Sequence, residues 1–134
     1  MRKKNRNYFI LLLVLEVFLF CACASSTDKN NVHLYDESGL PLWAGKTFTN
    51  PQGIWAGPVT EKGYYASGQA KYSDEKSSLA AAELDAKVRL ADFARSSISG
   101  AYRVDKFTAS DGRVYVLFFI SEKSVKNQHK QVEP

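Results

Sequence analysis

Apolar and polar positions alternate from Tyr64 to Tyr72, and this period of two predicts a β-strand. Ala66, Gly68 and Ala70 fall on the same face of that strand. Three small residues in a row allow another element to approach closely, and the segment that follows has a helical pattern. We therefore interpret Gly68 as a packing residue; the chain contains no glycine-rich phosphate-binding motif.

A helical pattern begins near Ser73 or Asp74, either of which can cap a helix, and continues through Ala94 toward Gly100. Alanine, leucine and long charged residues favour the helical conformation. Projected at 100° per residue, its apolar positions form two stripes. The first stripe comprises Leu79, Ala82, Ala86, Leu90 and Phe93, and the second comprises Ala80, Leu84, Val88, Ala91 and Ile98. We expect one stripe to pack on the sheet and the other on an aromatic segment or on another protomer.

Two further β-rich runs, 101–108 and 114–120, flank Ser110-Asp111-Gly112. Asp-Gly between such runs is typical of a β-hairpin. The second run is apolar on both faces, which predicts a central strand covered on both sides, by the tryptophan-containing segment or by an oligomer partner. The pattern as a whole predicts an α+β fold, in the order strand, helix, hairpin, with one long helix packed on a small, mainly antiparallel sheet.

Aromatic residues punctuate the turn-rich segment between Leu40 and Val59, and two more open the first long strand. One interpretation is that these rings only fill the core, because each buries a large area at low entropic cost. The alternative is that some of them line a groove for a ligand or partner. The candidate binding residues are Trp43, Trp55, Tyr64 and Tyr65.

The first 22 residues have the pattern of a bacterial lipoprotein signal peptide, with a basic start, an apolar run from Tyr8 to Phe20 and Ala22 before Cys23. The apolar run is shorter than the roughly 20 residues that cross a bilayer. We expect cleavage before Cys23 and acylation of its sulfur, which would anchor the protein to a membrane. Ala24 and Ser25, with no aspartate, resemble an outer-membrane sorting signal. Phe20 departs from the leucine that is usual three positions before the acylated cysteine.

Polar residues dominate 23–39, which we interpret as a flexible tether, and 122–134, which we interpret as a polar tail. The predicted folded domain therefore spans 40–121. The two histidines, His33 and His129, fall in the polar ends without cysteine or clustered carboxylate partners, so no metal site is expected.

The net charge of +4 is concentrated in the signal segment, which has four basic residues and one acidic residue. Removing it leaves 14 basic and 13 acidic residues, a net charge of +1 (14 − 13). Interspersed charges of this kind do not form the basic surface that nucleic acid requires, so no nucleic-acid partner is expected. The only cysteines are Cys21 and Cys23, so the predicted domain has no internal disulfide.

Catalytic patterns are weak in this chain. Ser73 and Lys76 match the spacing of a Ser-x-x-Lys nucleophile motif, but the accompanying Lys-Thr-Gly and Ser-Asp-Asn motifs are missing, and Ser73 is better explained as a helix cap. Glu83 and Asp85 are two positions apart on the helix and cannot face each other as an acid and base pair. We therefore expect no enzymatic activity, no catalytic residues and no cofactor.

A run of motifs resembles the lipoprotein-20 family of bacterial envelope lipoproteins. The motifs are Pro41-Leu42-Trp43, then Gly63-Tyr64-Tyr65-Ala66-Ser67-Gly68-Gln69-Ala70, then a helix with Ala82, Ala86, Leu90 and Ala91, and a strand pair around Asp111-Gly112. They span roughly 40–121, with Ser67 in place of the valine frequent in relatives. The resemblance implies a surface-associated or periplasm-facing lipoprotein without known catalysis. The same fold type occurs in the N-terminal region of a flagellar assembly lipoprotein, which implies a role in envelope or motility-associated assembly.

Two functional hypotheses follow. In the first, the domain is a membrane-tethered module that binds an envelope protein, or itself, through a spare apolar face. In the second, it binds a small ligand in a pocket of aromatic side chains.

Overall fold

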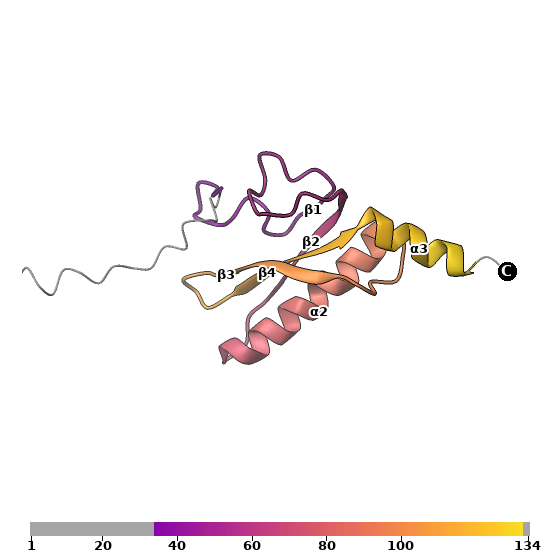
Figure 1. Cartoon of the computed structure of the whole chain (residues 1–134). Helices are drawn as coiled ribbons and strands as arrows, with labels where there is room; N and C mark the ends of the chain where they lie inside the picture. Colours follow the sequence, from indigo (N-terminus) through magenta and orange to yellow (C-terminus); the bar gives the residue numbers. More distant parts are fainter. Residues whose placement is uncertain (1–33, 133–134) are drawn as a thin grey trace, which may run out of the picture.

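The computed structural model describes residues 34–132, so the predicted signal peptide, Cys23 and most of the predicted tether lie outside the described residues. The elements in chain order are β1 (Thr47–Phe48), β2 (Gly63–Ala70), α2 (Glu75–Ala94), β3 (Tyr102–Thr108), β4 (Val114–Ser121) and α3 (Glu122–Val132). The α+β architecture predicted from the sequence, with its strand-helix-hairpin order, is confirmed (Figure 1).

The four strands form one sheet in the order β1-β2-β4-β3, and each neighbouring pair is antiparallel. The predicted hairpin is β3–β4, in which Thr108 pairs with Val114. Strand β4 is central, and its residues from Val114 to Ile120 are all buried, as its apolar sequence predicted. Because β2 and β3 lie on either side of β4, α2 crosses the sheet to connect them.

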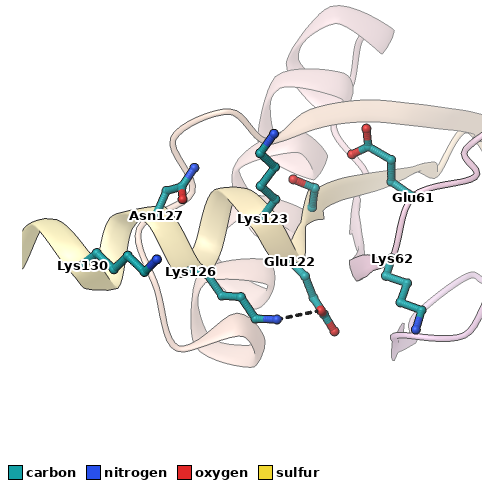
Figure 2. A pocket seen from close by; sticks show the side chains of 8 residues that line it. Glu61, Lys62, Glu122, Lys123, Lys126, Asn127 and Lys130 are labelled. Atoms are coloured by element: carbon teal, nitrogen blue, oxygen red, sulfur yellow. Dashed lines mark hydrogen bonds and ion pairs between the residues drawn. The ribbon is translucent and has the colours of Figure 1, made fainter.

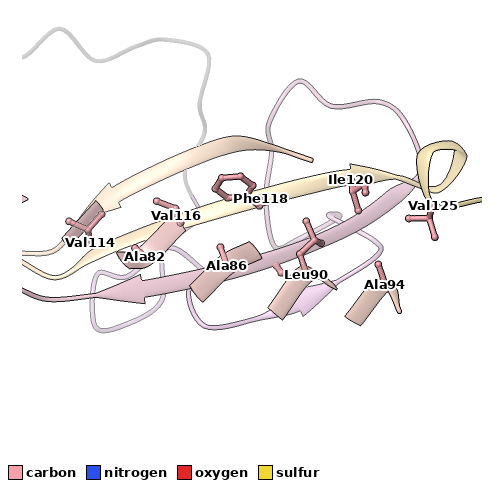
Figure 3. Close-up of a cluster of buried hydrophobic side chains, with 10 residues drawn as sticks. Ala82, Ala86, Leu90, Ala94, Val114, Val116, Phe118, Ile120 and Val125 are labelled. Atoms are coloured by element: carbon pink, nitrogen blue, oxygen red, sulfur yellow. The ribbon is translucent and has the colours of Figure 1, made fainter. Parts of the chain in front are cut away.

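Helix α2 packs on one face of the sheet through Ala82, Ala86 and Leu90, all fully buried (Figure 3). The helix begins after Asp74, whose carboxylate accepts a hydrogen bond of 2.8 Å from the backbone N–H of Ser77. Gly68 of β2 lies directly under the helix: a Cβ there would overlap the backbone of Ala82 and Ala86. The predicted close approach over the small-residue face is therefore confirmed.

The segment 40–59 covers the opposite face of the sheet, on the other side from α2 (Figure 1). Trp43, Trp55 and Phe48 from this segment pack with inward-facing side chains of the strands, which are Tyr65, Tyr115, Leu117 and Phe119. The second cover of β4 is thus the tryptophan-containing segment of the same chain. The ring nitrogen of Trp55 also donates a hydrogen bond of 2.9 Å to the buried carboxylate of Asp105.

The structure corrects the predicted C-terminal boundary, because the expected polar tail forms helix α3 directly after β4. Val125 is 4% exposed and joins the core between α2 and the sheet. Gln128 accepts a hydrogen bond from the Ser96 hydroxyl, and its amide donates to the Ser99 carbonyl. One apolar anchor and these bonds hold α3 against the sheet and against the segment that follows α2.

The folded part also begins before the predicted boundary at Leu40. Tyr35 forms an isolated β-bridge with Pro41, and the carboxylate of Asp36 accepts hydrogen bonds from the backbone of Ser38 and Leu40. Residues 34–39, the end of the predicted tether, therefore form a turn that is hydrogen-bonded to the domain.

Candidate functional site

The four predicted binding residues do not form one pocket. Trp43, Trp55 and Tyr65 lie on the aromatic side of the sheet, whereas Tyr64 faces α2 and meets the edge of Phe93 at 5.7 Å between ring centroids. Adjacent residues of a strand point to opposite faces, so Tyr64 and Tyr65 are separated by the sheet itself. Trp43 and Tyr65 are at most 1% exposed and belong to the core.

Tyr65 is the most enclosed of the four. Its ring stacks on Phe48 at 4.9 Å and lies 4.8 Å from the Phe119 ring. Within residues 34–132, its hydroxyl and the Trp43 ring nitrogen are buried without a hydrogen-bond partner. Burial raises the pKa of the Tyr65 hydroxyl to about 12, because the phenolate would be poorly solvated. No proton transfer near neutral pH is expected of such a group.

Of the four, Trp55 lines a surface hollow with a volume of about 440 Å³. Tyr102, Arg103 and Val104 form its opposite wall, and residues 58–61 complete it. The guanidinium of Arg103 donates a 2.6 Å hydrogen bond to Glu83 of α2, so its charge is already paired. The hollow is thus an open depression with two aromatic side chains and one paired cation.

A second hollow, of about 430 Å³, lies where α3 leaves the sheet (Figure 2). Lys62, Lys123, Lys126 and Lys130 line it together with Glu61 and Glu122. Lys126 pairs with Glu122 at 3.3 Å, which neutralises part of the local positive charge. What remains is a mildly basic, solvent-exposed surface.

The most unusual surface feature is a row of side chains on the outer side of α2, spaced four residues apart. We call it the outer row; its members are Lys76, Ala80, Leu84, Val88 and Asp92, all exposed. Leu84 is 65% exposed and Val88 is 53% exposed, among the highest values for large hydrophobic residues in the described chain. Side chains at this spacing lie one above another on a helix, so the row is continuous.

The outer row contains three residues of the second apolar stripe predicted from the sequence, Ala80, Leu84 and Val88. Ile98 of that stripe lies beyond the end of the helix and packs against the core. We expected this stripe to pack on the aromatic segment or on another protomer. The first alternative is wrong, because the aromatic segment packs on the opposite face of the sheet. Ser78, in the first turn of α2, is buried, and its hydroxyl accepts a hydrogen bond from Tyr72 N–H. Ser78 is the first member of a row of buried residues spaced four apart along the helix, which are Ser78, Ala82, Ala86, Leu90 and Ala94.

Paired charges border the outer row on both sides. Glu83 contacts Arg103 of β3 at 2.6 Å on one side, and Asp85 contacts Arg89 at 3.1 Å on the other. Asp85 also accepts a hydrogen bond of 3.0 Å from the backbone of Gln69, which ties the helix to β2. These ion pairs fix the borders of the row and leave its apolar centre open to solvent.

Within residues 34–132, no three His, Cys, Asp or Glu side chains gather as a metal-binding group. The helices in that range are also too short or too polar to cross a bilayer. Sequence reasoning missed two structural features: the Trp55–Asp105 hydrogen bond, which links residues 50 positions apart, and the docking of α3 through Val125. Alternation along the sequence places Asp105 on the same face as Arg103, and it is a register shift between these two residues that turns Asp105 toward the aromatic side, so the sequence carried no signal of this bond.

In comparisons with family models, curated proteins and solved structures, no match to this chain was found.

Proposed function

We propose that this protein is a lipid-anchored, non-catalytic interaction module of the bacterial cell envelope, and that the outer row of α2 is its contact surface. The observation that carries the proposal is the exposure of Leu84 and Val88 at the centre of a long, well-packed helix. The outward side of such a helix is normally polar, and an apolar strip there is typical of an interaction site.

The fold itself supports this choice of surface. Helix α2 covers one face of β2 and β4 and segment 40–59 covers the other, so the apolar side chains of these two strands are not available to a partner. Tyr35, Tyr72, Phe93 and Tyr102 are also exposed, but they belong to four different parts of the domain. The outer row is the place where large exposed apolar side chains follow one another on a single rigid element.

The anchor rests on the N-terminal sequence. Arg2, Lys3 and the apolar run up to Phe20 precede a small residue and Cys23, in the order that lipoprotein processing requires. A cysteine acylated at that position would hold the domain at a membrane surface. Ala24 and Ser25, which follow it, favour sorting to the outer membrane. The motility-associated assembly implied by the lipoprotein-20 resemblance is one setting in which such a tethered module would act.

Site-specific photo-crosslinking in intact cells tests the contact surface. A photoreactive residue replaces Leu84 in the full chain, and a matched chain carries it at Ser110, an exposed residue in the β3–β4 turn. We expect a discrete crosslinked band from position 84 and none of comparable yield from position 110. A position-84 chain that crosslinks no more than the position-110 chain would contradict the proposal.

The second candidate function is binding of a small ligand in the hollow beside Trp55. It is favoured by the two aromatic side chains and the Arg103 guanidinium around 440 Å³ of open volume, a size that fits a small molecule. Native mass spectrometry of protein isolated from cells tests it. A copurifying ligand lost in Arg103→Ala would support this function, and a ligand-free spectrum would exclude it.

A further inference from the structure

The outer row has a symmetry that points to its partner. Leu84 is at its centre, with Ala80 and Val88 four residues away on either side and Lys76 and Asp92 eight residues away. If a second α2 lies antiparallel across the first, with a two-fold axis at Leu84, each Lys76 faces an Asp92. Each Ala80 then faces a Val88, and Leu84 faces Leu84.

We propose that the partner of the outer row is a second copy of this chain, bound antiparallel through α2. The proposal rests on the proposed function and names its partner. A two-fold interface requires a surface that is complementary to itself, and few helix faces meet that condition in both charge and size.

Charge argues for the antiparallel direction. Among residues 34–132, Lys76 and Asp92 take part in none of the ion pairs, while Glu75, Glu83 and Asp85 on the same helix are all paired. An antiparallel pair would place two Lys76–Asp92 contacts at its ends. A parallel pair would place Lys76 against Lys76 and Asp92 against Asp92, which is unfavourable.

Side-chain size gives the same answer. Pairing Ala80 with Val88 places a small residue opposite a larger one at both positions, so the helices can approach closely on each side of the central leucines. Asp92 lies 16 positions after Lys76, a rise of about 24 Å along the helix. Rows of side chains spaced four residues apart run alongside each other when two helices cross at about −50°, a common crossing angle in globular proteins, so this angle lets the whole row make contact.

The contact involves one helix from each copy, so it is smaller than a standard protein interface. We therefore expect a weak dimer for freely diffusing protein. Anchoring both copies to the same membrane raises their effective concentration and favours the dimer without any additional contact. Self-association should consequently be much stronger in the envelope than in dilute solution.

Disulfide crosslinking of the full chain in its own envelope tests the register. Leu84→Cys places two thiols at the two-fold axis, within the short Cα–Cα distance that a disulfide needs. We expect a disulfide-linked homodimer from this variant and little from Val88→Cys alone, because Val88 faces Ala80. When Ala80→Cys and Val88→Cys chains are mixed, a disulfide should form between positions 80 and 88 of the two copies, with Leu84 left unchanged in both. Ser110→Cys and the unmodified chain are the controls.

Charge reversal tests the end contacts, with the yield of the Leu84→Cys crosslink as the readout. Lys76→Asp or Asp92→Lys alone should lower the yield about fivefold, because each replaces two attractive contacts by repulsive ones. The double variant should restore it. Both reversals follow the preference of a helix for acidic residues at its start and basic residues at its end, so the fold should be retained.

The outcomes separate this inference from the function on which it rests. Register-specific crosslinking with rescue by the double reversal supports the antiparallel dimer. If position 84 crosslinks only to a different protein, the self-association inference is overturned and the interaction function stands. Equal disulfide yields at positions 84, 88 and 110 would indicate random collision and overturn the inference. The absence of any position-84 crosslink, by disulfide or by photochemistry, would overturn both.

Discussion

Replacing Gly68 by alanine should strongly destabilise the fold, because it adds one carbon where β2 and α2 are closest. The new Cβ would overlap the carbonyl oxygen of Ala82 and the backbone nitrogen and Cα of Ala86. These are backbone atoms of a 20-residue helix, so no side-chain rotation relieves the overlap. The helix as a whole has to move away from the sheet.

The size of the effect follows from that movement. Overpacking a well-packed core costs about 1–3 kcal/mol. The upper end applies here, because a displaced helix also loosens the contacts of Ala82, Ala86 and Leu90 with the sheet. A loss of about 3 kcal/mol is a large share of the roughly 5–15 kcal/mol that stabilises a typical domain. It corresponds to a fall in melting temperature of roughly 12 to 24 °C for a domain of this size.

Urea-induced unfolding followed by tryptophan fluorescence measures this loss, since Trp43 and Trp55 are both buried. Gly45→Ala is the matched control: Gly45 has a φ of 73°, and no atom lies within 4 Å of the point that a Cβ would occupy. It should cost only the left-handed backbone penalty of about 1 kcal/mol. A Gly68→Ala protein as stable as Gly45→Ala would refute the close contact between β2 and α2.

Three other predictions follow from single residues. Tyr65→Phe should raise the free energy of unfolding by about 1 kcal/mol in urea titrations, because it removes a buried hydroxyl that has no partner within residues 34–132. The pKa of Tyr65 is raised to about 12 in the folded state, so as the pH rises the tyrosine of the unfolded chain loses its proton first. The free energy of unfolding should therefore fall between about pH 10 and 12, and this fall should be smaller in Tyr65→Phe. The hydrogen bond from the Ser77 N–H holds the pKa of Asp74 below its usual value. The stabilisation by this helix cap is therefore present above about pH 4 and is lost as the pH falls further. In Asp74→Ala the free energy of unfolding should depend less on pH in that acidic range. Cys23→Ser should abolish fatty-acid labelling and release the protein from the membrane fraction, and unchanged labelling would refute acylation at that residue.

Patterns that repeat along the sequence predicted two of the strands correctly. The alternation around Ala66 and Gly68 predicted β2 and the face on which α2 lies, and the apolar run from Val114 to Ile120 predicted a doubly covered central strand. Both patterns repeat over eight residues, so the information is redundant. The covering of β4 by segment 40–59 was one of two alternatives, and the structure selects it.

Features that depend on a single distant contact could not be predicted in this way. Helix α3 is held mainly by Val125 and by hydrogen bonds of Gln128, and neither produces a periodic apolar signal. The proposed grouping of Tyr64 with Tyr65 failed for a reason that was present in the sequence, because adjacent strand residues face opposite sides. The outer row was visible as a second stripe, but only the fold establishes that segment 40–59 does not cover it.

The exposure of position 84 in the native envelope tests the central claim most directly, whatever the partner is. Leu84→Cys and Ser110→Cys chains are kept reduced, so that no disulfide forms, and are labelled with a small maleimide. Labelling is carried out first in intact envelopes and then after dispersal and dilution in mild detergent. The unmodified chain reports any labelling of the native cysteines. The account predicts that position 84 is protected in the envelope and becomes reactive on dilution, while position 110 reacts equally in both. Equal labelling of position 84 in both conditions would contradict the claim that α2 carries the contact surface.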